Sequence, residues 1–143
     1  MSEQIILTTS YGVALADASV PCVITQWHGF ANKTEFIALQ EAALLYYEQH
    51  STPAKPWGWV GDVRRMGAIP AEAQRWLQDE FNPRALAAGL RVVSVVVAET
   101  IFGQIATQRY VQQTTTSTAL LGVSYYPSLE EAKKGAQQEL QAR

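Results

Sequence analysis

The sequence predicts an α/β fold, in which a mostly parallel mixed sheet is covered by helices and the elements follow the order ββαβαβαβα. Three observations predict this fold. Runs of β-branched and aromatic residues alternate with stretches whose apolar residues have helical spacing. The run Val92–Ala98 is β-branched on both faces, as is typical of a central strand covered on both sides. The length of 143 residues suits one domain, so we assign residues 1–143 to a single domain.

The first predicted elements are extended segments that form an antiparallel hairpin. The stretch from Val13 to Asp17 ends in a turn, and the stretch from Val20 to His28 is rich in β-branched and aromatic residues. Gly29 ends the second segment. The residues Ile5 to Leu7 form a short β-prone patch before the hairpin.

The clearest helix is predicted from Lys33 to Gln49. Asn32 is a favourable N-cap, and Glu35 stands three residues later, where it completes a capping box. A strand follows from Trp57 to Val63, and the residues Arg64 to Gly67 are expected to lead out of it.

A second helix is predicted to begin at Pro70, because proline is favoured at the first helical position. Pro83 lies inside this helix and cannot donate a backbone hydrogen bond, which predicts a kink or break near Asn82. Gly89 suits the C-terminal cap.

The last third of the chain predicts a helix, a strand and a final helix. Thr100 can cap a helix from Ile101 to Gln112, and Leu120 to Tyr126 forms the last strand. Ser128 and Glu131 have the spacing of a second capping box at the start of the final helix.

Composition and charge exclude several classes of protein. Hydrophobic residues make up 48% and charged residues 17% of the chain, the balance of a globular domain. The net charge of −2 gives no general attraction for nucleic acid or for an anionic membrane. The apolar runs are too short to span a bilayer, and the first residues lack the features of a signal peptide. We therefore expect a cytoplasmic protein that binds no nucleic acid.

Known catalytic and cofactor motifs are not found in the sequence. His28 and His50 are far apart, and no histidine, cysteine and carboxylate spacing resembles a metal site. The single cysteine, Cys22, excludes an internal disulfide and is expected to be a core residue. A nucleophilic pair of Cys22 with His28 is an alternative, since both could lie on one strand at even spacing. We expect no metal, no cofactor, no catalytic residues and no enzymatic activity.

Three stretches of the sequence resemble small uncharacterised bacterial proteins close to the STAS group, which has the SpoIIAA-like fold. These stretches are TQWHGF at 25–30, WVGDVRRMGAIPAEAQRWL at 59–77 and PRALAAGLRVVSVVVAETIFG at 83–103. The resemblance covers nearly the whole chain and consists of a pattern of strands, turns and helix faces. It implies the fold and a role as an interaction or regulatory module.

The resemblance to STAS-type anti-sigma-factor antagonists also implies where a phosphorylatable serine would stand. In those proteins the serine opens the helix that corresponds here to Ala68–Glu72. No serine or threonine lies between Val60 and Arg91, so that phosphorylation switch cannot operate at this site. A protein partner remains possible without it. The alternative is a small-ligand or lipid-binding domain of the same fold, a class that includes CRAL-TRIO domains.

One surface is predicted to bind a ligand or a partner. In open α/β sheets, ligands favour the carboxyl ends of the strands, where the loops Gly29–Asn32, Asp62–Pro70 and Glu99–Phe102 should gather. Each loop leads into a helix N-terminus, which favours anions. Arginines at the same edge would add positive charge. The predicted site residues are Asn32, Asp62, Arg64, Arg65, Glu72 and Thr100.

Two interpretations of this charged surface remain open. The surface binds an acidic group of a partner protein or small ligand, and Asp62 orients an arginine. Alternatively, Arg64 or Arg65 pairs with Asp62 or Glu72 and only stabilises the loop.

A second candidate surface is aromatic and consists of Trp57, Trp59, Tyr125 and Tyr126 on the predicted strands. Exposed aromatic residues there would suit self-association into a homodimer or a partner, unless helices cover them.

Overall fold

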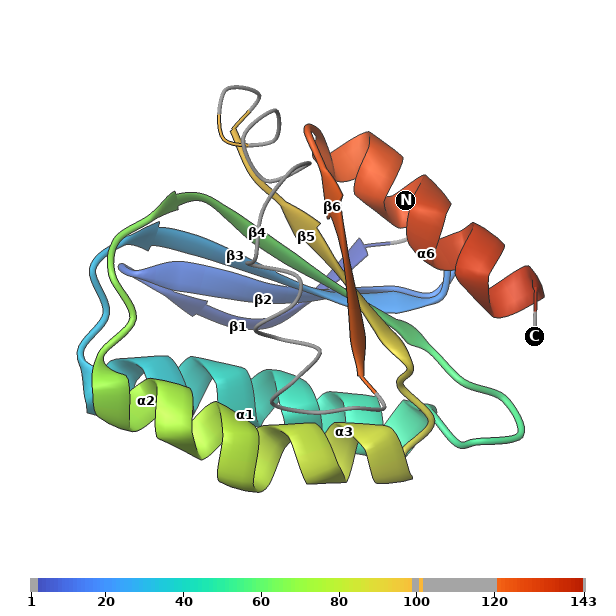
Figure 1. The fold of residues 1–143 in the computed structure, drawn as a ribbon, viewed down its shortest axis with the longest axis horizontal. Helices are drawn as coiled ribbons and strands as arrows, with labels where there is room; N and C mark the ends of the chain where they lie inside the picture. Colours follow the sequence, from blue (N-terminus) through green and yellow to red (C-terminus); the bar gives the residue numbers. More distant parts are fainter. Residues whose placement is uncertain (1–2, 99–100, 102–120, 143) are drawn as a thin grey trace.

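The computed structural model describes residues 3–98, 101 and 121–142, which form a mixed sheet with helices on both faces (Figure 1). The six strands of this part of the chain lie side by side in sequence order. They are β1 (Glu3–Thr9), β2 (Gly12–Asp17), β3 (Cys22–Gly29), β4 (Gly58–Met66), β5 (Val92–Val96) and β6 (Gly122–Tyr126). The helical segments are α1 (Lys33–His50), α2 (Ala71–Trp76), η1 (Leu77–Phe81), α3 (Asn82–Ala87) and α6 (Leu129–Gln141).

The sheet has an antiparallel and a parallel half. β1, β2 and β3 pair antiparallel, whereas β3 with β4, β4 with β5, and β5 with β6 pair parallel. This confirms the predicted mixed α/β architecture. The β-prone patch at Ile5–Leu7 is part of a full strand, so the chain opens with three antiparallel strands where the sequence predicted a two-stranded hairpin.

The valine run is an interior strand, as predicted. β5 lies between β4 and β6 and pairs parallel with both. Ser94 and Val96 are buried on it, while the intervening valines are half-buried. Parallel strands need crossover connections, and these place helices on the faces of the sheet.

Helix α1 covers one face of the sheet. Asn32 and Glu35 form the predicted capping box, with the Glu35 N–H donating to Asn32 Oδ1 over 2.8 Å. Trp27 of β3 stacks on Phe36 with ring centroids 4.6 Å apart. The buried side of this helix consists of Phe36, Leu39, Gln40, Ala43, Leu44 and Tyr47.

Beside α1 on the same face lies a second helical rod, formed by α2, η1 and α3 (Figure 1). The kink predicted near Asn82 is a turn of π-helix over Leu77–Phe81 and not a break. The Asn82 N–H donates to the carbonyl of Leu77, five residues earlier, just before Pro83 withholds its own hydrogen bond. The wider turn lets the helix continue past the proline, and Phe81 reaches the core, edge-on to Trp59 at 4.9 Å.

An arginine fork joins the two helical segments of this face. Arg84 of α3 donates to both carboxylate oxygens of Glu41, over 2.9 and 2.8 Å, and to Glu48 over 2.8 Å. Hydrogen bonds from the guanidinium to Glu48 and Glu41 raise the pKa of Arg84 above its usual value. The guanidinium of Arg84 therefore stays charged, and its hydrogen bonds hold α3 against α1.

Helix α6 covers part of the opposite face (Figure 1). Its Ala132 and Ala136 pack on a smaller core whose sheet members are Cys22, Ile24, Val60 and Val96. Cys22 is fully buried there, and burial raises the pKa of its thiol to about 12. The residue is thus a core side chain, as the sequence predicted.

A partly buried cluster of ion pairs ties α6 to the antiparallel half of the sheet. The Lys133 ammonium lies 2.6 Å from Asp17 Oδ2 and 2.9 Å from Glu3 Oε2. Burial by itself raises the pKa of Asp17, but hydrogen bonds from Lys133 and Ser19 outweigh it and the pKa lies below its usual value. Burial by itself lowers the pKa of Lys133, but the hydrogen bonds to Asp17 and Glu3 outweigh it, and the pKa lies above its usual value.

Gly135 leaves room for a close contact between α6 and β6. A Cβ at this position would overlap the phenol ring of Tyr126, whose hydroxyl group occupies that space. Glycine ordinarily weakens a helix interior. Here the missing side chain lets the tyrosine of the edge strand pack against the helix backbone.

The helix predicted from Ile101 to Gln112 lies, apart from Ile101, outside the described residues. Within the part of the chain that the structure describes, no helix combines the length and apolar character needed to cross a membrane.

The first prediction concerns Gly135. We expect Gly135→Ala to lower the free energy of unfolding by up to about 2 kcal/mol, because overpacking against Tyr126 costs about 1–3 kcal/mol and the gain in helix propensity returns only about 1 kcal/mol. Urea denaturation measures the change. In a Tyr126→Val background the same substitution should be neutral or stabilising. Equal losses in both backgrounds would contradict the assigned contact.

The second prediction concerns the pH dependence of stability. The pKa of Asp17 is lowered in the folded state, so its contribution to stability is present above about pH 4, the unfolded pKa, and is lost as pH falls through the folded pKa. Asp17→Asn should therefore be less stable than the parent at pH 7, and the difference should shrink in acid. Urea titrations across this range measure it. Asp79→Asn, which alters an exposed carboxylate, should show no such convergence.

Candidate binding site

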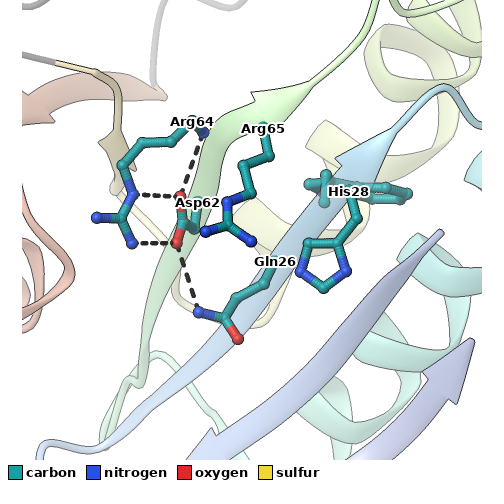
Figure 2. Close-up of a pocket in the computed structure, with 6 residues that line it drawn as sticks. Gln26, His28, Asp62, Arg64 and Arg65 are labelled. Atoms are coloured by element: carbon teal, nitrogen blue, oxygen red, sulfur yellow. Dashed lines mark hydrogen bonds and ion pairs between the residues drawn. The ribbon is translucent and has the colours of Figure 1, made fainter. Parts of the chain in front are cut away.

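An open depression of about 530 Å³ lies where β3 and β4 end (Figure 2). It is lined by Gln26, Trp27, His28, Asp62, Arg64 and Arg65. The core beneath α6 uses earlier residues of the same strands, Ile24 and Val60, so the depression begins where that helix contact stops. All the described residues of its lining thus come from the carboxyl ends of two parallel strands.

A register shift places the charged residues of β4 on this face. Gln26 pairs with Asp62, but His28 pairs with Arg65, so β4 contains one more residue than β3 over this interval. Such a bulge re-aims the side chains that follow it. Arg64 keeps the face of Asp62, while Arg65 is brought opposite His28. Regular alternation would have sent Arg65 to the α1 face, which Val63 and Met66 contact.

Asp62 and Arg64 form a bidentate ion pair. Arg64 donates from Nε to Asp62 Oδ1 over 2.9 Å, from Nη2 to Oδ2 over 2.7 Å, and from its backbone N–H to Oδ1 over 3.2 Å. Gln26 adds a longer bond of 3.4 Å to Oδ2. The side chain of Asp62 is only 9% exposed, against 39% for Arg64.

The pair keeps its charges at neutral pH. Burial by itself raises the pKa of Asp62, but the hydrogen bonds from Arg64 and Gln26 outweigh it and the pKa lies below its usual value. The hydrogen bond to Asp62 raises the pKa of Arg64. Both pKa values move away from neutrality, so neither group is poised to exchange a proton in that range.

Arg65 and His28 are the groups left for a ligand. Both are exposed, and within the described part of the chain neither side chain has a hydrogen bond or an ion pair. Figure 2 shows the Arg65 guanidinium between Asp62 and the His28 ring, on the open side of the strands. Among the described lining residues, two arginines and one carboxylate give one net positive charge. The arrangement can hold an anion through the planar guanidinium fork.

The structure brings together half of the predicted site residues. Asp62, Arg64 and Arg65 line the depression. Asn32 does not, because its side chain caps α1. Glu72 lies at the start of α2 and faces Lys33 at 3.9 Å, an exposed contact that contributes little. Thr100 and most of the predicted loop Glu99–Phe102 lie outside the described residues.

The predicted end of the strand that was expected from Trp57 to Val63 was wrong. The sequence placed Arg64 and Arg65 in a loop after Val63, whereas β4 continues to Met66. Pairing with the end of β3 extends it, and the Gly67 N–H donates to the Gly29 carbonyl over 2.8 Å just beyond. Strand pairing overrides the low β propensity of consecutive charged residues. Of the two partners considered for the arginines, the structure shows Asp62 with Arg64.

Gln26 and His28 were missed by the sequence analysis. Their even spacing along β3 places them on one face at the carboxyl end of the strand, and this signal was available. The sequence did not show which residues of β4 lie beside them, because the register of β3 against β4 is a tertiary property. The alternative pairing of Cys22 with His28 is wrong: Cys22 is buried beneath α6, while His28 is exposed at the far end of β3.

The third prediction separates the two arginines by stability. Arg64→Gln should lower the free energy of unfolding by about 1 kcal/mol, because it leaves the buried Asp62 carboxylate short of donors, although water reaching the half-exposed site limits the loss. Arg65→Gln should change it by less than about 0.5 kcal/mol. Denaturation of both variants at neutral pH measures the difference. Equal losses would show that Arg65 is also structural.

Comparisons with known proteins bear on the fold alone. No protein-family model matches the chain, and no curated protein matches it in sequence. Among solved structures, the chain is similar to an uncharacterised protein of the DUF3478 family from Shewanella loihica PV-4, described as having a SpoIIAA-like fold. The TM-score is 0.59 at 7% identity, and the match covers 94% of this chain and 91% of the other. The chain therefore has a SpoIIAA-like fold, as the resemblance in the sequence implied.

Proposed function

We propose that the protein is a non-enzymatic interaction module that binds an acidic group of a partner protein at the depression between β3 and β4. The observation that supports this proposal is Arg65, which is exposed beside His28, makes no ion pair with any described residue, and lies next to an ion pair that already satisfies Asp62. An acidic group entering there gains a guanidinium fork without having to displace an internal carboxylate from it.

The pKa shifts at the site support binding over proton-transfer catalysis. General acid–base catalysis favours groups whose pKa lies near the working pH. The hydrogen bonds between Asp62 and Arg64 lower the pKa of Asp62 and raise the pKa of Arg64, so both pKa values move away from neutral pH. Among the described residues, no cluster of histidine, cysteine and carboxylate side chains is arranged to hold a metal ion.

The shape of the depression supports a protein partner over a lipid or other apolar ligand. Small apolar ligands bind in enclosed cavities lined mainly by apolar side chains. The depression is open, and five of the six described residues that line it are polar or charged. A small-ligand domain of the same fold is therefore the second candidate, with a small anion as its ligand.

The absence of a serine or threonine from the segment between Val60 and Arg91 shapes the kind of regulation we propose. In the structure, Pro70 is the N-cap of α2, and no side chain makes a capping hydrogen bond there. The module would then bind its partner without a phosphorylation switch at the start of this helix, and its affinity would depend on charge and ionic strength.

The fourth prediction tests the anion site directly. An oligoglutamate peptide added to the isotopically labelled protein should shift the backbone amide resonances of Gln26, His28 and Arg65, and salt should weaken the effect. Arg65→Gln should reduce the apparent affinity by about tenfold. Arg75→Gln is the matched control, because Arg75 is an exposed arginine on α2 with the same formal charge.

The outcomes distinguish the proposals. Shifts at the three residues that disappear in Arg65→Gln but persist in Arg75→Gln support the acidic-partner site. Equal loss in both variants would indicate only a general charge effect and would overturn it. Inorganic phosphate that shifts the same amides more strongly than the peptide at equal concentration would favour the small-anion candidate instead.

A further inference from the structure

A large exposed aromatic side chain stands at the same edge of the sheet as Arg65. Phe30 is 63% exposed, although a phenylalanine is usually buried. It follows Gly29, the last residue of β3, and is two residues from His28. Exposed aromatic residues next to arginine are the composition of a protein-binding hot spot.

Backbone contacts between the two strand exits hold Phe30 close to the site. The Gly67 N–H donates to the Gly29 carbonyl over 2.8 Å. A Cβ at Gly67 would lie 3.4 Å from the Cα of Phe30, so the backbone segments that follow β3 and β4 run side by side at this point. Gly67 is two residues from Arg65. Both strands therefore lead from the charged depression to Phe30 within two residues.

The backbone conformation of Gly29 sets the direction in which the chain leaves β3 before Phe30. Its φ of +72° lies in the left-handed region, which a residue with a side chain rarely adopts. The turn directs the chain away from β3 immediately before Phe30. Because Gly29 is hydrogen-bonded to the exit of β4, the position of the Phe30 backbone depends on the same strand pairing that positions Arg65.

From these contacts we infer that Phe30 is the apolar anchor of the site, and that its occupant is a polypeptide segment of another protein carrying an acidic residue beside a large apolar residue. This inference rests on the proposed function and adds the chemistry of the partner. The acidic side chain pairs with Arg65, whose charge is left over after Asp62 and Arg64 neutralise each other. The apolar side chain covers Phe30 and removes its ring from water.

Two matched variants isolate the contribution of Phe30. Phe30→Ala removes the proposed anchor, and Leu45→Ala removes an exposed apolar side chain of α1, 48% accessible, that is outside the lining of the depression. Neither side chain is buried, so both variants should fold, and thermal melts check this. Arg65→Gln and Arg75→Gln complete the set.

The experiment starts from a random peptide library displayed on phage and selected on the wild-type protein, with the Arg65→Gln variant as counter-selection. The enriched peptides should carry aspartate or glutamate next to a large apolar residue. Fluorescence anisotropy of a synthetic copy should show binding weakened about tenfold by Phe30→Ala and less than about twofold by Leu45→Ala. Replacing the apolar residue of the peptide by serine should make Phe30→Ala neutral.

Each result has one interpretation. Binding that is weakened by Arg65→Gln but unaffected by Phe30→Ala overturns the apolar anchor and leaves the proposed acidic site intact. Binding that is insensitive to Arg65→Gln, or a selection that enriches no peptide over that variant, overturns the proposed function together with this inference. Equal effects of Phe30→Ala and Leu45→Ala would also overturn the anchor.

Discussion

The parallel pairing of β3 with β4, with its single register shift, is the constraint on which the candidate site depends. Up to Gln26 and Asp62 the two strands run in step, and their side chains belong to the cores beneath the helices. One extra residue in β4 then brings Arg65 opposite His28. Without it, alternation would place Arg64 and Arg65 on opposite faces of the sheet. The bulge thus gathers two positive charges on one surface.

The Asp62–Arg64 pair makes this concentration of charge tolerable. A nearly buried carboxylate is costly unless donors satisfy it, and Arg64 supplies three of them. In return, the carboxylate neutralises one of two adjacent guanidinium groups. The remaining charge on Arg65 faces water, where it costs little. Structural and binding roles are in this way divided between neighbouring residues of one strand.

The two faces of the sheet differ in how they are held. On the face of α1, two helical segments are joined by the Arg84 fork and by a core rich in aromatic rings. On the other face, α6 contacts the sheet through alanine, and through the bare backbone at Gly135. Small residues let the helix approach closely, and the Lys133 pairs secure its outer side. This close helix covers the first halves of β3 and β4, and the depression occupies their carboxyl ends.

Much of this protein could be predicted from local sequence, because local signals decide local structure. The capping box at Asn32, the interior character of the valine run and the fully buried Cys22 all followed from spacing and residue type. The SpoIIAA-like fold followed from the order of the elements. A pairing of Asp62 with one of the two arginines was among the interpretations left open, and the structure selects Arg64.

Only the tertiary structure decided the length of β4, the π-helical turn before Pro83 and the place of His28 beside Arg65. Each depends on a partner far away in sequence. β4 continues because the end of β3 offers hydrogen bonds, and the helix runs past Pro83 because the π-helical turn accommodates it, with Phe81 packed on Trp59. Register between strands is set by the packing of whole faces, and no short stretch of sequence contains that information.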